Sequence, residues 1–127
     1  MKSVSALLID DADWEFEVLT RLAEEFSRYS LEAQWAPSPE RARQDDLGSF
    51  QIVIFDRGCA RESVESEMRQ LRDAGFDGRI IVVSNSYPQD MIDADLAAGA
   101  DAGIAKSDLT AENIEATFDQ LLASTGT

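Results

Sequence analysis

Residues 4–11 read VSALLIDD, a short apolar run that ends in two aspartates. Three further apolar runs also end at a polar residue: FQIVIFD at 50–56, IIVVS at 80–84 and AGIAK at 102–106. Short apolar runs rich in β-branched residues and bounded by polar clusters are typical of buried parallel strands. The sequence therefore predicts four buried strands, each with a polar side chain at its carboxyl end.

Helical periodicity fills the intervals between these strands. The predicted helices cover 13–29, 37–46, 62–74, 88–98 and the segment after a Thr110 cap, and a weaker alternating strand covers 31–36. Gly75 and Gly99 are expected to end the third and fourth helices. Successive βα units predict an α/β, flavodoxin-like (βα)5 sandwich whose parallel sheet has the order 2-1-3-4-5.

Length and composition favour one acidic domain. The 127 residues are 44% apolar, which suits a single core, and we expect one domain at 1–123 with a short tail at 124–127. Twenty-five acids oppose 11 bases, for a formal charge of −14, which disfavours direct binding to nucleic acid or to anionic membranes. The same charge makes a divalent cation or a basic protein surface a plausible partner.

Several classes of site are excluded by residue type. The chain has no histidine, which rules out histidine-ligated zinc and serine triads. The single cysteine, Cys59, cannot form an internal disulfide, and no apolar stretch reaches the roughly 20 residues of a membrane span. The N-terminus leads directly into a strand without a signal-peptide pattern, so we expect a cytoplasmic location.

The polar residues that follow the strands predict a common site. In a sheet of order 2-1-3-4-5 the ligand crevice lies between the first and third strands, whose ends carry Asp10, Asp11 and Asp56. Clustered carboxylates need a cation or raised pKa values, and oxygen-only ligands suit Mg²⁺ shared with a phosphate. A carboxylate is also a nucleophile toward phosphorus. Lys106 and Ser84 would then neutralise and bind phosphoryl oxygens.

Each of these residues has a plainer structural explanation when taken alone. Asp10 and Asp11 would cap the first helix, Asp56 would lie in a turn, and Lys106 would pair with an acid. Their joint occurrence at the ends of different strands favours the functional interpretation.

At these residues the chain resembles the receiver domain of two-component response regulators. The resemblance covers essentially the whole chain and rests on LLIDD at 7–11, IVIFD at 52–56, IVVS at 81–84 and AGADAGIAK at 98–106. It implies that Asp56 accepts a phosphoryl group from a phosphohistidine on a sensor histidine kinase or a histidine phosphotransfer protein. The domain would be a signalling domain with slow autodephosphorylation, not an enzyme.

The resemblance also implies the roles of the other site residues. Mg²⁺ would be bound directly by Asp11, Asp56 and the backbone carbonyl of Gly58, and through water by Asp10. Lys106 would pair with the Asp56 carboxylate and then with the phosphoryl group. Ser84 would turn toward the phosphate as the switch hydroxyl.

The chain departs from the usual receiver pattern around this site. The aromatic residue expected three positions before the lysine is Gly103, and the proline after the lysine is Ser107. The small residue beside the switch hydroxyl is Asn85, which would narrow donor access or bind the phosphate. The loop after Asp56 reads RGCARESV at 57–64, without the usual proline. The chain is therefore an atypical variant.

Two neighbouring features bear on these departures. Tyr87 follows the Ser84 loop; we expect a solvated loop side chain, with a substitute for the missing aromatic as the alternative. Arg57 and Arg61 flank the acids, where surface ion pairing is expected and steering of an anionic donor is the alternative.

Two functions remain open for this sequence. The first is a phosphoacceptor domain that signals through the face of 88–98, 102–105 and the last helix, or through the first helix. The second is a pseudo-receiver, a protein-binding module independent of phosphorylation, which the missing aromatic and the altered loop favour. A haloacid-dehalogenase-type enzyme is disfavoured, because Ala12 stands where that family has a second acid.

Overall fold

The computed structural model describes residues 1–123, so the tail expected at 124–127 lies outside the described residues. The strands are β1 (Lys2–Ile9), β2 (Tyr29–Ala36), β3 (Ile52–Asp56), β4 (Arg79–Ser84) and β5 (Ala102–Ala105). All neighbouring strands pair in parallel, in the order β2-β1-β3-β4-β5. The predicted (βα)5 fold and strand order are confirmed.

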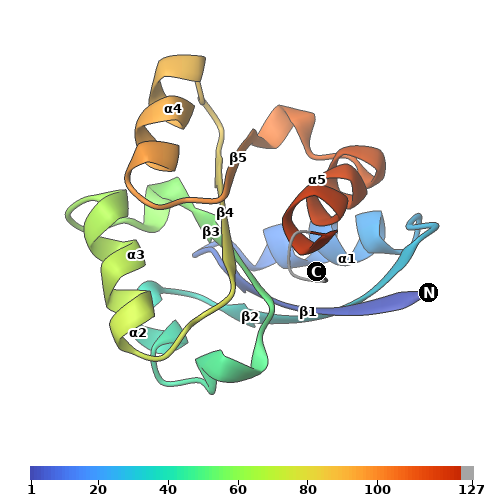
Figure 1. Ribbon diagram of the computed structural model, residues 1–127, viewed down its shortest axis with the longest axis horizontal. Helices are drawn as coiled ribbons and strands as arrows, with labels where there is room; N and C mark the ends of the chain where they lie inside the picture. The colour runs from blue at the N-terminus through green and yellow to red at the C-terminus, as the bar shows by residue number, and fades with distance from the viewer. Residues whose placement is uncertain (124–127) are drawn as a thin grey trace.

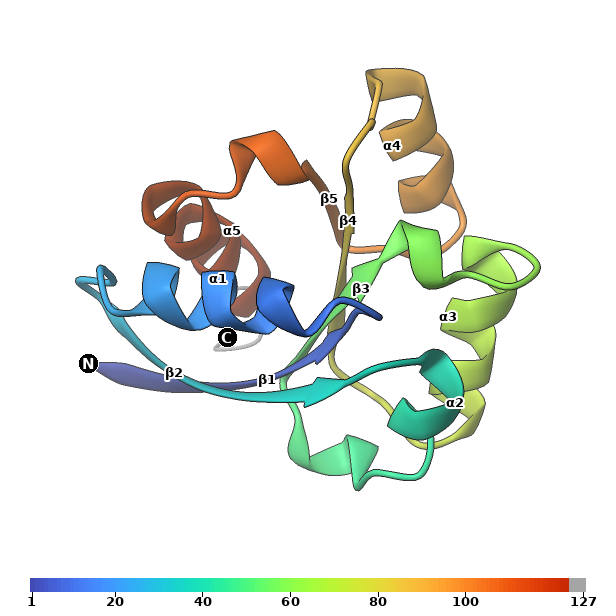
Figure 2. The same cartoon turned by 180° about the vertical axis from the view of Figure 1, so that it is seen from behind.

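Helices cover both faces of the sheet. They are α1 (Asp13–Ala23), α2 (Pro39–Ala42), α3 (Val64–Asp73), α4 (Gln89–Ala97) and α5 (Ala111–Ala123), with 3₁₀ turns η1 (Leu47–Ser49), η2 (Arg57–Cys59) and η3 (Lys106–Asp108). Helices α1 and α5 lie on one face, and α2, α3 and α4 lie on the other (Figures 1 and 2). Among the described residues, no helix has the length and apolarity needed to cross a membrane.

Alternating strand residues form two apolar cores, because successive side chains point to opposite faces of the sheet. The core under α3 and α4 contains Leu7, Val53 and Phe55, and the core under α1 and α5 contains Leu8 and Ile54. Since both faces are covered, β3 is buried along its whole length, as its apolar sequence indicates.

The first helix is shorter than its periodicity predicts. Helix α1 ends at Ala23, and Tyr29 begins β2. Phe26 and Tyr29 still reach the core, where both rings pack edge-on against Phe118 of α5. Apolar spacing alone therefore overestimates the length of the helix, because residues of the following turn and strand can bury side chains in the same core. Trp14 is 59% exposed and is not part of the core.

The observed end of α2 differs from its predicted end, whereas α3 and α4 end just before the predicted glycines. Ser38 caps α2 and accepts the Arg41 N–H, but α2 ends at Ala42 and not near residue 46. Gly75 and Gly99 follow α3 and α4 with φ of 109° and 125°, the left-handed conformation that glycine adopts without strain. Both predicted glycine stops are confirmed.

Gly78 lies where the chain enters β4, and we predict that Gly78→Ala is destabilising. An added Cβ would overlap the backbone carbonyl oxygen of Gln51, which accepts the Arg79 N–H. Relieving that overlap displaces the start of β4, which we expect to cost about 1–3 kcal/mol in the free energy of unfolding. Gly48→Ala is the control, because its Cβ would meet nothing closer than Asp46 Oδ1 at 3.8 Å. Urea denaturation of both variants tests the difference; equal losses would contradict the steric argument.

Candidate functional site

The carboxyl ends of four strands lie at one rim of the sheet. Ile9 pairs with Phe55, and Ser84 pairs with Ala105, so β1, β3, β4 and β5 end in register. Asp10 and Lys106 are the residues that follow β1 and β5, while Asp56 and Ser84 are the last residues of β3 and β4. The parallel register thus brings together four polar groups that are far apart in the sequence.

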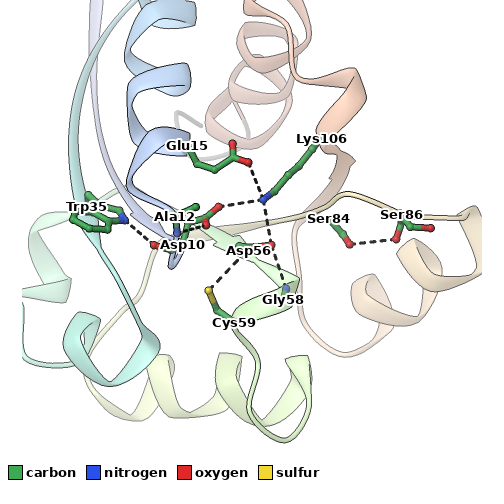
Figure 3. Close-up of polar contacts among 10 residues, drawn as sticks. All are labelled: Asp10, Ala12, Glu15, Trp35, Asp56, Gly58, Cys59, Ser84, Ser86 and Lys106. Atoms are coloured by element: carbon green, nitrogen blue, oxygen red, sulfur yellow. Dashed lines mark hydrogen bonds and ion pairs between the residues drawn. The ribbon is translucent and has the colours of Figure 1, made fainter.

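Lys106 lies between three carboxylates at this rim (Figure 3). Its ammonium is 3.1 Å from Glu15 Oε1, 3.3 Å from Asp10 Oδ2 and 3.6 Å from Asp56 Oδ1. The side chains of Lys106, Glu15 and Asp10 are at least 88% buried, so solvent screens these charges only weakly. Three acids share one cation, which leaves the cluster with an excess of negative charge.

Burial and neighbouring charge alter the titration of this cluster. Burial raises the pKa of Asp10, and the Asp56 carboxylate raises it further against the opposing effect of the Ala12 N–H and Lys106. For Lys106, burial by itself would lower the pKa, but Glu15, Asp56 and Asp10 together raise it above its ordinary value. Lys106 therefore stays charged at neutral pH, while the surroundings of Asp10 disfavour its ionised form.

The acidic side chains form a group of metal-ligand type. One ligand atom each from Asp10, Asp11, Asp56 and Cys59 lies within 4.8 Å of the others. The three carboxylates are the oxygen ligands that a hard divalent cation such as Mg²⁺ prefers. Burial and the Asp56 charge raise the pKa of Cys59 to about 12, so its thiol remains protonated. The donor set therefore fits Mg²⁺ through its oxygen atoms.

The turn after β3 holds the Asp56 carboxylate. Its Oδ1 accepts the Gly58 N–H at 3.2 Å, and its Oδ2 lies 3.8 Å from Cys59 Sγ. Gly58 belongs to η2, so this short turn orients the carboxylate toward Lys106 and the other acids. On the opposite side, the indole N–H of Trp35 donates to the Asp10 carbonyl at 2.7 Å.

The remaining rim residues do not contact Asp56. The Ser84 hydroxyl donates to the carbonyl of Ser86 at 3.2 Å, within its own loop (Figure 3). Asn85 beside it is exposed. Gly103 lies in β5, under α4 and the β4–α4 loop.

Tyr87 is not the solvated loop side chain that the sequence suggested. It is 8% exposed and packs into the core under α3 and α4. Its hydroxyl donates to Asp95 of α4, and Asp95 also accepts from Arg57. Arg57 is therefore tied to a buried acid, whereas Arg61 makes the expected exposed ion pair, with Glu40.

The comparisons with known proteins concern the fold. No family model matches the sequence, and no curated protein matches it. A two-component response regulator from Clostridium difficile has a similar structure, with a TM-score of 0.79 at 16% identity over 98% of this chain and 99% of that one. A response regulator receiver domain from Clostridium thermocellum gives 0.77 at 18% identity over 96% of both chains, and a response regulator from Thermotoga maritima gives 0.76 at 18% over 95% and 98%.

The chain has the receiver fold.

Within this receiver fold, the structure adds two residues that the sequence did not assign to the site. Glu15, in the first turn of α1, makes the shortest contact to Lys106. Asp95 of α4 is 4% exposed and accepts from both Arg57 and Tyr87. Neither has a local signature, although a buried lysine in an acidic chain indicates that nearby carboxylates must exist.

Proposed function

We propose that the chain is the receiver domain of a two-component or phosphorelay system and that Asp56 is its phosphoacceptor. The observation that carries this proposal is the Asp56 carboxylate, buried at the crevice of a receiver fold and held by Lys106 and the Gly58 N–H. A carboxylate at this place is oriented to receive a phosphoryl group, and the Lys106 ammonium and the Gly58 N–H beside it can bind phosphoryl oxygens.

The chemistry is a displacement at phosphorus. One Asp56 carboxylate oxygen forms a bond to phosphorus while the bond between phosphorus and the donor histidine nitrogen breaks. The electron pair of that bond returns to the imidazole, and Asp56 becomes an acyl phosphate. Lys106 lies 3.6 Å from Asp56 Oδ1, close enough to neutralise one phosphoryl oxygen as the charge moves. Ser84 and Asn85 are proposed to bind the others, with Ser84 leaving its bond to Ser86.

Magnesium is the proposed cofactor. Asp11, Asp56 and the Gly58 carbonyl would bind it directly, and Asp10 would do so through water. The support is the close group of carboxylate oxygens and their uncompensated charge. When bound, the cation neutralises charge shared between the acids and the phosphoryl group. The chain's own residues, Lys106 and Gly58, orient the Asp56 carboxylate.

The proposed partners follow from this chemistry. The donor is a sensor histidine kinase or a histidine phosphotransfer protein, and the setting is the cytoplasm where such donors act. The output would be a protein bound through the face of α4, β5 and α5, or through α1. The domain would act as a signalling domain, with self-phosphorylation and slow hydrolysis of its own acyl phosphate as its only reactions.

A second candidate is a binding module whose conformation does not depend on phosphate. Two observations favour it. Gly103 has no aromatic side chain that could change position when the Ser84 hydroxyl moves, and the Ser84 hydroxyl already donates to the Ser86 carbonyl. Its conformation would be set by partner binding alone.

Metal and phosphodonor titration distinguishes the two candidates. We expect Mg²⁺ to change the fluorescence of Trp35, because its indole donates to the carbonyl of Asp10, and to raise Tm by relieving repulsion between the acids. A small acyl phosphate should then add one phosphoryl mass to the intact chain. A chain that shows neither a metal response nor a mass gain would be the binding module.

A further inference from the structure

Tyr87 fills the space beside Gly103 of β5. A Cβ added at Gly103 would lie 3.0 Å from both Cε2 and Oη of Tyr87, and 3.0 Å from Cγ2 of Ile92 on α4. These distances are shorter than ordinary van der Waals contact, and Tyr87 is 8% exposed. The glycine at 103 therefore allows a tyrosine from the preceding loop to pack where a side chain of β5 would otherwise lie.

The Tyr87 hydroxyl ends a chain of polar contacts that begins beside the phosphoacceptor. It donates to Asp95 Oδ2 at 2.5 Å, and the same carboxylate accepts from Arg57 Nε at 2.9 Å and Nη2 at 3.4 Å. The Asp95 side chain is 5% exposed and that of Arg57 32% exposed. A two-point contact between a guanidinium and a buried carboxylate restricts the orientation of both groups.

This polar chain joins three segments. Arg57 is the first residue of η2 and directly follows Asp56, Asp95 is the buried acid of α4, and Tyr87 belongs to the β4–α4 loop. The same η2 turn carries Gly58, whose N–H donates to Asp56. Two adjacent residues of η2 thus make different contacts: Gly58 donates to the Asp56 carboxylate, and Arg57 binds Asp95 of α4.

We propose that Tyr87 and Asp95 are positioning residues that hold Arg57, and through it the η2 turn, so that phosphorylation of Asp56 alters α4. This inference rests on the proposed function. When an Asp56 oxygen is esterified to phosphorus, its contacts with the Gly58 N–H and Lys106 must be remade, which displaces η2. Because Arg57 holds the buried Asp95 carboxylate at two points, that displacement is carried to α4 and to the loop that contains Tyr87 and Ser84.

The sequence departures around the site fit this role. Gly103 removes the side chain that would compete with Tyr87 for space, and the substituted loop after Asp56 supplies Arg57 as the partner of Asp95. Gly103 and the altered loop after Asp56, which depart from the usual receiver pattern, thus allow a different connection between Asp56 and α4.

Hydrogen–deuterium exchange of the α4 peptide tests the proposal. The wild type, Tyr87→Phe and Tyr29→Phe are compared with Mg²⁺ alone and with Mg²⁺ plus beryllofluoride, and phosphoryl loading by an acyl phosphate is followed by intact mass. Tyr29→Phe is the matched control, since Tyr29 is a 5% exposed tyrosine whose hydroxyl donates to an aspartate of α5, Asp119. Tyr87→Phe keeps the ring over Gly103 and removes only the hydroxyl.

We expect wild type and Tyr29→Phe to change α4 exchange on beryllofluoride addition, and Tyr87→Phe to lose this change while still gaining the phosphoryl mass. Arg57→Gln breaks the polar chain from its other end and is expected to give the same loss. Unaltered α4 exchange in phosphorylated wild type, or a wild-type response in Tyr87→Phe, overturns this inference alone. A wild-type chain that gains no phosphoryl mass overturns the proposed function and this inference together.

Discussion

Asp56→Asn is expected to leave the chain folded and to abolish phosphoryl transfer to it. The amide keeps the shape of the carboxylate and an oxygen that can accept the Gly58 N–H, but its oxygen is not a nucleophile toward phosphorus. With an acyl phosphate and Mg²⁺, intact mass spectrometry should therefore detect one added phosphoryl group in the wild type and none in Asp56→Asn.

The fold of this variant is expected to be at least as stable as the wild type without metal. The Asp56 charge raises the pKa of Asp10, which means that the two carboxylates repel. Removing one of them relieves that repulsion, so the Tm in the absence of Mg²⁺ should not fall. Asp13→Asn, at an exposed acid at the start of α1, is the control and should be phosphorylated normally. A phosphoryl adduct that persists in Asp56→Asn would assign the acceptor to another residue.

Glu115→Ala is expected to cause the largest loss of stability among substitutions outside the apolar cores. The Glu115 carboxylate is 3% exposed and accepts the backbone N–H groups of Ser27, Arg28 and Tyr29 at 2.7–3.1 Å. These donors lie in the turn that leads into β2 and at the first residue of that strand, and truncation removes the Glu115 acceptor from all three. Each unsatisfied donor is costly, so Tm should fall by on the order of 10 °C.

In the wild type, low pH should remove the stabilising contribution of the Glu115 carboxylate. Burial raises the pKa of Glu115, but the three N–H donors and Arg28 outweigh it and hold the pKa below its ordinary value. A carboxylate with a depressed pKa stabilises the fold fully above about pH 4.3, and this stabilisation is lost as the pH falls through the folded-state pKa. The Tm difference between wild type and Glu115→Gln should therefore narrow in acid.

Glu112→Ala, at an exposed glutamate in the first turn of α5, is the control for helix propensity and net charge. Its Tm should stay close to that of the wild type. If Glu115→Ala were no less stable than Glu112→Ala, the turn between α1 and β2 would not depend on this carboxylate.

The fold and the position of the site could be predicted from local patterns. Apolar runs at 50–56 and 80–84 are long enough and rich enough in β-branched residues to specify buried strands, and Gly75 and Gly99 end helices wherever the chain places them. Because parallel strands align their carboxyl ends, Asp10, Asp56 and Lys106 had to approach one rim once the strand order was known.

The partners of the buried charges could not be predicted in this way. Glu15 and Lys106 are 91 positions apart, and Glu115 and Ser27 are 88 apart. An amphipathic pattern places a residue on a helix face but does not say which distant atom that face meets. Glu15 is consequently indistinguishable in the sequence from the solvated acids around it, such as Glu17.

The sequence by itself determined the (βα)5 architecture and the set of polar residues at the crevice, because strand and helix periods and glycine stops are local properties. The tertiary structure decided how those residues are engaged: Lys106 is shared by three acids, and Tyr87 is buried against Gly103 and bonded to Asp95. The physical reason is that packing of α1 and α4 on the sheet sets these contacts, and no short segment encodes that packing.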